Sequence, residues 1–184
     1  VEPLRQIWGM RHSVKVSDPK QLTGNFNAHM DAKILAIAEE SFWGGDRKAD
    51  SVIKDMITSD RMMLERKFMD AIEVKDCRRF IFLSNADNVI RATPDERRYA
   101  VTVVTDERKH DAAYFKSLAG QIASGKVASA LVHLLLDLKV TVDLRNPPRT
   151  DALIGQILTN LPAEDRWLRA VLENGTFPDA MGDS

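Results

Sequence analysis

The sequence has 184 residues, of which 44% are hydrophobic and 29% are charged, and its formal net charge is −1. This length and composition predict a soluble protein with one domain of ordinary size, and the near-neutral charge excludes bulk electrostatic attraction to nucleic acid. The single cysteine excludes an internal disulfide, and no apolar stretch is long enough to span a bilayer. We therefore expect a cytoplasmic protein without a membrane partner.

The first hundred residues alternate between helical and strand patterns. Apolar spacing predicts a helix over residues 4–8 that ends at Gly9, so we expect the sequence to begin inside a helix. The other predicted elements of this part are, in chain order, a strand at 12–17, a turn or short helix at 18–22, a strand at 33–38, a helix at 47–58, a hairpin with arms at 61–68 and 71–75, and strands at 79–83 and 99–104.

Beyond residue 106 the patterns are helical. Thr150 is a typical N-cap and Gly175 a typical helix end. Helices are predicted at 114–122, 127–138, 150–160 and 162–175. The chain is therefore expected to contain an α/β core (1–105), a helical C-terminal subdomain (106–175) and a flexible tail (176–184).

Two adjacent carboxylates, Glu39 and Glu40, follow the predicted buried strand 33–38. At the carboxyl end of such a strand, one acid can reach a phosphate-bound Mg²⁺ and the other can orient or deprotonate an attacking water. This is the Walker B arrangement of ATPases. On the residues alone, the alternative is that both acids face solvent.

Two further polar features lie next to predicted strands: an asparagine after one strand and a pair of arginines before another. Asn85 comes after the strand 79–83, where an amide can contact a γ-phosphate as the sensor 1 residue of P-loop ATPases does; alternatively, it only opens a turn. Arg97 and Arg98 precede the strand 99–104, where a guanidinium can reach the ATP of a neighbouring subunit as an arginine finger. Alternatively, the arginines and the acids before them form a solvated charge cluster.

Several short segments of the chain, taken in chain order, resemble the successive sequence blocks of phage and plasmid primase-helicases. These proteins are related to poxvirus-type superfamily 3 helicases. The matching blocks lie at 25–27, 33–40, 54–58, 65–67, 79–85, 95–99 and 146–150, and the helix around Trp167 follows. The resemblance implies a P-loop NTPase (AAA-like) core that binds ATP and Mg²⁺ and assembles as a homo-hexamer. It also implies unwinding of single-stranded or forked DNA in 3′ to 5′ direction during replication of a phage, prophage or plasmid in a bacterial host cell.

The resemblance assigns roles to named residues. It makes Glu39 the metal-binding acid and places Glu39, Glu40 and Asn85 around the nucleotide. Glu40, Asn85, Arg97 and Arg98 become the catalytic residues. We further expect Glu39, Glu40 and Asn85 to lie at one edge of the sheet, on adjacent strands.

The sequence departs from the family pattern at two places. The first acid is Glu39 where the family has aspartate, and no G-x-x-x-x-G-K-[ST] motif occurs. We interpret the missing motif as a truncation that removes the first strand and the phosphate-binding loop. The full-length protein is then expected to hydrolyse ATP, and these 184 residues alone are not.

The hairpin implied by the resemblance would project into the ring channel and contact DNA. Lys67 lies beside the predicted tip, and Arg66 and Lys75 add positive charge nearby. The alternative is that these are ordinary surface cations. Two other functions stay open: a non-enzymatic DNA-binding or replication-assembly module on an ATPase-like fold, and an unrelated α/β domain whose charges only decorate its surface.

Overall fold

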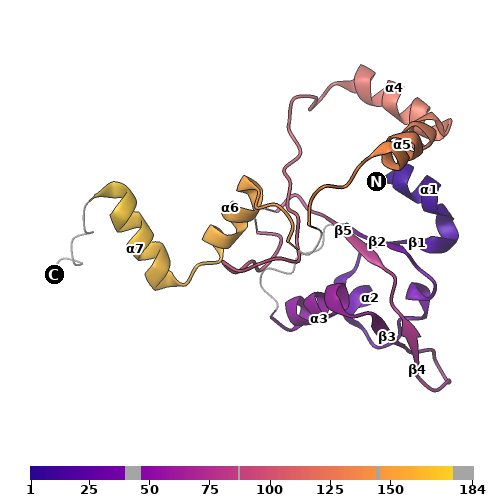
Figure 1. Ribbon diagram of the computed structural model, residues 1–184, viewed down its shortest axis with the longest axis horizontal. Helices are drawn as coiled ribbons and strands as arrows, with labels where there is room; N and C mark the ends of the chain where they lie inside the picture. Colours follow the sequence, from indigo (N-terminus) through magenta and orange to yellow (C-terminus); the bar gives the residue numbers. More distant parts are fainter. Residues whose placement is uncertain (40–46, 87, 144–145, 176–184) are drawn as a thin grey trace.

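A parallel three-stranded sheet forms the centre of the computed structural model, which describes residues 1–184 except 40–46, 87, 144–145 and 176–184 (Figure 1). The strand order is β1 (Ser13–Val16), β2 (Leu35–Glu39) and β5 (Arg79–Leu83). The central strand β2 is buried from Leu35 to Ala38, because it has a neighbour on each side. The register pairs Val16 with Ala38 and Glu39 with Leu83, so all three strands end at the same edge.

Short helices cover the sheet on the side that carries the first core cluster. These are α2 (Pro19–Thr23), the one-turn η1 (Ala28–Met30) and α3 (Arg47–Thr58). The Asp18 carboxylate caps α2 by accepting from the backbone N–H of Lys20. The buried members of this cluster are Val16, Leu22, Met30, Ala38, Ala49 and Ile53.

The predicted hairpin is present and extends away from the sheet (Figure 1). It consists of β3 (Arg61–Leu64) and β4 (Ile72–Lys75), which are antiparallel. The Asn27 side chain holds the loop end of β3 by donating to the Met63 carbonyl at 2.7 Å and accepting from the Glu65 N–H at 2.8 Å. Because one side chain ties both the strand end and the start of the loop, the hairpin leaves the body in a defined direction.

Residues 99–104 do not form the predicted strand. They lie in an irregular segment, and Val103 and Val104 are 78% and 88% exposed. The strand prediction was wrong because β-branched residues favour a strand only where a neighbouring strand pairs with them. This segment instead enters a second core cluster with α6 (Asp151–Thr159), made of Ile90, Ala92, Tyr99, Leu153 and Ile157.

The other helices lie at the two ends of the molecule. Helix α5 (Lys126–Asp137) contacts both α1 (Glu2–His12), which is kinked at Gly9, and α4 (Ala112–Ala123). Helix α7 (Ala163–Asn174) lies beyond α6, away from the sheet (Figure 1). The predicted flexible tail, 176–184, falls outside the described residues.

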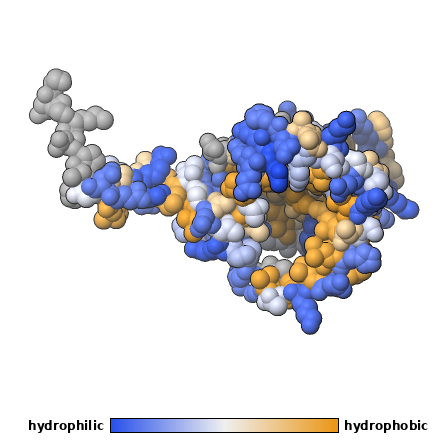
Figure 2. All heavy atoms as spheres, turned by 90° about the horizontal axis from the view of Figure 1, so that it is seen from above, coloured by the Kyte–Doolittle hydropathy of each residue, from blue (hydrophilic) through white to orange (hydrophobic). Residues whose placement is uncertain are grey.

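Apolar side chains border a hollow on the face seen in Figure 2. Several apolar residues of α5 are also exposed, with Leu136 at 79%. Among the described helices, none is long and apolar enough to cross a membrane by itself. Only α4 and α5 taken together reach that length and composition, and they are bent by 76° at the break between them.

Candidate functional site

The carboxyl ends of the three parallel strands border one pocket. Ser17 follows β1, Glu39 ends β2, and Leu83, Ser84 and Asn85 end and follow β5; together they line a cavity of about 320 Å³. Since Glu39 pairs with Leu83, Asn85 lies just beyond the point opposite Glu39. The structure thus brings Glu39 and Asn85 together at one edge, whereas Glu40 lies outside the described residues. The roles of these three side chains stay predictions.

A lysine from the neighbouring strand neutralises Glu39. Lys15 Nζ on β1 lies 2.8 Å from Glu39 Oε1, and both side chains are partly exposed. The Ser84 hydroxyl accepts from the N–H of Ala86 and so shapes the turn after β5. Sequence reasoning missed Lys15 and Ser17. Their two-residue spacing in a strand could have indicated that they share a face with each other.

The residues of this pocket offer side-chain oxygens of the kind that bind hard cations. A carboxylate, two hydroxyls and an amide are hard ligands, and Mg²⁺ commonly uses only one or two protein carboxylates together with waters and substrate phosphates. Within the described residues, no three His, Cys, Asp or Glu side chains gather into a metal cluster.

The tip of the hairpin carries cationic and aromatic side chains. Lys67 is exposed, and its Nζ lies 5.9 Å from the centre of the Phe26 ring. Phe68 is fully exposed and has a left-handed φ of 62°, which is uncommon for a residue other than glycine. Phe26 and Phe68 help to line a hollow of about 800 Å³ beside the tip. Sequence reasoning missed Phe68, although an aromatic residue next to lysine at a hairpin tip is typical of single-strand binding surfaces.

The other two predicted DNA-binding residues lie further from the tip or are already paired. Arg66 Nη2 donates to Asp31 Oδ2 at 2.8 Å, so its charge is partly neutralised. Lys75 ends β4 and is exposed at the base of the hairpin, opposite Arg61. Lys67 is therefore the better placed of the three to contact a polyanion.

The arginine pair follows a buried carboxylate in an irregular segment and not at the start of a strand. Glu96 Oε1 accepts from the backbone N–H groups of Arg97 and Arg98 at 3.0 and 2.9 Å, and the Arg98 guanidinium lies 3.6 Å from the same oxygen. Neither arginine lines the pocket of Glu39 and Asn85. A hydrogen bond from Thr93, with help from the charges of Arg98 and Arg97, holds the pKa of Asp95 below its ordinary value.

Comparison with known proteins gives a family and a fold. Residues 2–98, more than half of the chain, match the model of a family described as a family of unknown function (DUF5906). No curated protein matches the sequence.

Three solved structures of the C-terminal region of NrS-1 are similar. The apo structure of residues 305–718 has a TM-score of 0.68 at 18% identity, over 97% of this chain and 47% of that one. Two A-form apo structures have TM-scores of 0.61 and 0.66, both at 18% identity, over 97% and 95% of this chain and 46% and 43% of theirs. The chain thus spans about half of the region solved in NrS-1, and the likeness shows a shared α/β fold with a parallel sheet and C-terminal helices.

Proposed function

The chain belongs to the DUF5906 family, whose function is unknown, and we propose that it forms part of an ATP-driven DNA helicase of the superfamily 3 type. In this proposal the protein acts in phage, prophage or plasmid replication. The observation that carries it is the shared pocket of Glu39 and Asn85 at the carboxyl edge of adjacent parallel strands. Ligands of open α/β sheets bind at that edge. The α/β fold with a parallel sheet, which the chain shares with the NrS-1 C-terminal region, provides such an edge.

The pocket would take the triphosphate of ATP with its Mg²⁺. Glu39 would hold the ion through its waters, and the ion would neutralise charge on the phosphoryl oxygens. Glu40, next in the chain, would orient and deprotonate the attacking water, and the Asn85 amide would donate to the γ-phosphate or position that water. Lys15, which pairs with Glu39, would turn towards the incoming phosphate charge.

ATP hydrolysis also needs a loop that grips the phosphates, and this sequence contains no such motif. Among the described residues, β5 pairs only with β2, so its other edge can accept one more parallel strand. We propose that the strand before the phosphate-binding loop pairs there in the full-length protein. It would bring the loop amides and lysine to the same edge as Asn85.

The arginine pair would serve a neighbouring subunit. Arg97 and Arg98 lie outside the pocket of their own chain, and the Arg97 guanidinium forms no ion pair with the described residues. In a homo-hexameric ring, such a guanidinium can reach the ATP bound next door and stabilise charge in the transition state.

The hairpin would contact single-stranded or forked DNA. Lys67 would bind phosphates as a mobile point charge, and Phe68 would stack on a base. Base-independent contacts of both kinds suit a motor that moves along any sequence.

An ATPase assay on the full-length protein tests the proposal. We expect Mg²⁺-dependent hydrolysis that single-stranded DNA stimulates and that Glu40→Gln abolishes. An exposed acid of α7 provides the matched control, Glu164→Gln, which should leave the rate unchanged. DNA binding without any hydrolysis by the wild-type protein would favour the alternative, a non-enzymatic module on an ATPase-like fold.

A further inference from the structure

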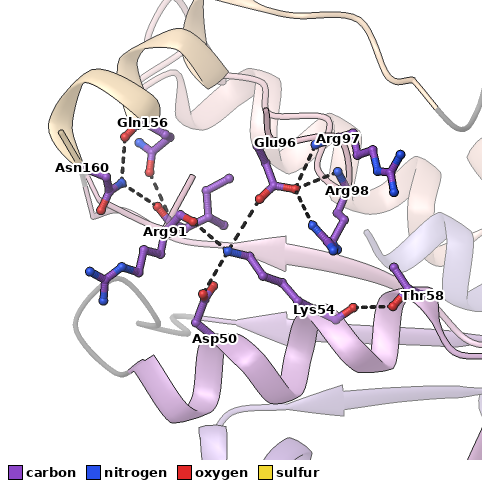
Figure 3. Close-up of polar contacts among 10 residues, drawn as sticks. Asp50, Lys54, Thr58, Arg91, Glu96, Arg97, Arg98, Gln156 and Asn160 are labelled. Atoms are coloured by element: carbon purple, nitrogen blue, oxygen red, sulfur yellow. Dashed lines mark hydrogen bonds and ion pairs between the residues drawn. The ribbon is translucent and has the colours of Figure 1, made fainter. Parts of the chain in front are cut away.

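A buried charge cluster joins α3 to the segment that carries the arginine pair (Figure 3). Lys54 Nζ donates to Asp50 Oδ2 and to the Arg91 carbonyl oxygen, both at 2.9 Å, and lies 3.6 Å from Glu96 Oε2. The Lys54 side chain is 19% exposed and that of Glu96 only 1%. Such a cluster is unusual, because burying charged groups costs solvation free energy that only ion pairs and hydrogen bonds can offset.

Glu96 uses both of its oxygens. One faces Lys54, and the other accepts from the N–H groups of Arg97 and Arg98. The carboxylate therefore fixes two successive peptide groups of the arginine pair to an ammonium that belongs to α3. Tyr99 is buried beside the cluster, and burial, with the carboxylates of Asp50 and Glu96, raises the pKa of its hydroxyl.

Helix α6 holds the residues that precede the arginine pair (Figure 3). Gln156 Oε1 accepts from the N–H groups of Val89 and Ile90 at 2.8 and 3.3 Å, and Asn160 Nδ2 donates to the Ile90 carbonyl at 2.9 Å. Residues 89–91, a few positions before the arginine pair, are thus hydrogen-bonded to both α3 and α6. The ion pair between Lys54 and Glu96 restrains residues 95–98 relative to α3.

We propose that Lys54 and Glu96 are positioning residues that hold the backbone of Arg97 and Arg98, so that the pair is aimed at the nucleotide of the neighbouring subunit. This inference rests on the proposed function for its consequence, in-trans catalysis. Asp50 anchors Lys54 on α3, and α3 ends at Thr58, directly before the hairpin strand that begins at Arg61. One helix therefore connects the DNA hairpin to the arginine pair.

Kinetics of full-length variants give the first test. Lys54→Met, which keeps length and removes charge, should lower kcat by roughly tenfold to a hundredfold, because misplacement of a catalytic group by about 1 Å has that effect. The KM for ATP should change little, since the variant's own pocket is intact. Lys54→Arg should recover most of the rate by restoring the ion pair.

Mixed rings separate positioning from general damage. A Lys54→Met subunit keeps its pocket and has misaligned arginines, whereas a Glu40→Gln subunit has the reverse defect. Rings that contain both should therefore regain ATPase activity. Rings that assemble normally by size and stay inactive would overturn the proposal, because Lys54 would then act on its own subunit's pocket.

Hydrogen exchange tests the positioning without any reference to ATPase activity. In full-length Lys54→Met, peptides covering residues 95–99 should exchange faster, because the Glu96 carboxylate no longer holds the two N–H groups, while peptides from β2 keep the wild-type rate. Unchanged exchange at 95–99 would overturn the proposal. If the wild-type protein has no ATPase activity, but Lys54→Met still speeds exchange at residues 95–99, the helicase function is rejected and the positioning role stands.

Discussion

The carboxylate of Glu39 and the side-chain amide of Asn85 border one pocket, at the carboxyl edge of two adjacent parallel strands. Four of the residues that line this pocket offer an oxygen atom from their side chains: Ser17, Glu39, Ser84 and Asn85. The two strands bring together groups that are far apart in the sequence, at the edge where open α/β sheets bind their ligands.

Asn85→Ala in the full-length protein should lower kcat by about 10² to 10³, the usual cost of losing one donor that acts in the transition state. Glu39→Gln should instead raise the Mg²⁺ concentration needed for half-maximal activity, because a neutral amide binds the hydrated ion less well. Steady-state ATPase assays over a magnesium series measure both effects. Identical behaviour of the two variants would contradict the separate roles.

The 184-residue chain by itself should not bind ATP in the micromolar range. It contains no phosphate-binding motif, so the pocket offers Glu39 and Asn85 without the loop amides and lysine that grip the phosphates. Calorimetry with Mg-ATP measures this, after circular dichroism has shown that the chain is folded. Micromolar binding would mean that these residues form a complete nucleotide site.

Arg97→Ala and Arg98→Ala should identify the arginine that acts across the subunit interface. At the correct position the change should lower kcat by about a thousandfold, with much less effect on nucleotide affinity. The control is Arg166→Ala on α7, an exposed arginine outside this segment. Mixing the inactive variant with Glu40→Gln should restore part of the activity, and mixed rings without activity would show that neither arginine works in trans.

Lys67→Ala should weaken single-stranded DNA binding to the same extent for all base sequences. The loss of one phosphate contact lowers the slope of log K against log salt by about 0.7. ATP binding should be unaffected, because Lys67 is not among the residues that line the Glu39 and Asn85 pocket. Titrations at several salt concentrations, with Lys116→Ala on α4 as an exposed control, check the contact. A slope equal to that of the wild type would leave Lys67 as an ordinary surface cation.

Phe68→Ala should weaken single-stranded DNA binding by about 1–3 kcal/mol if the ring stacks on a base, and Phe68→Trp should retain it. Unlike Lys67→Ala, this change should leave the salt slope as it is, since no phosphate contact is lost. Phe115→Ala on α4 removes an aromatic side chain that is 50% exposed and lies away from the hairpin, and it should have no effect. Equal losses for Phe68→Ala and Phe115→Ala would contradict stacking at the tip.

Local patterns were enough to predict most of the regular elements. The helix at 47–58 and the strand at 79–83 have the predicted bounds. The hairpin forms where it was predicted, but its first arm ends at Leu64 and not at residue 68. Thr150 caps α6 by accepting from the N–H of Leu153. These features depend on periodicity, capping and alternation, which are written in a few neighbouring residues.

Contacts between distant segments decided the rest. The strand predicted at 99–104 is absent, because pairing depends on a partner strand that no local pattern reveals. Lys54 and Glu96 are charged residues that a pattern assigns to the surface, yet the packing of α3 against the arginine segment buries Glu96 and leaves only 19% of the Lys54 side chain exposed. The sequence by itself determined which residues end the strands β2 and β5. Only the tertiary structure decided that Lys15 pairs with Glu39 and that Glu96 holds Arg97 and Arg98, because these contacts follow from sheet order and helix packing.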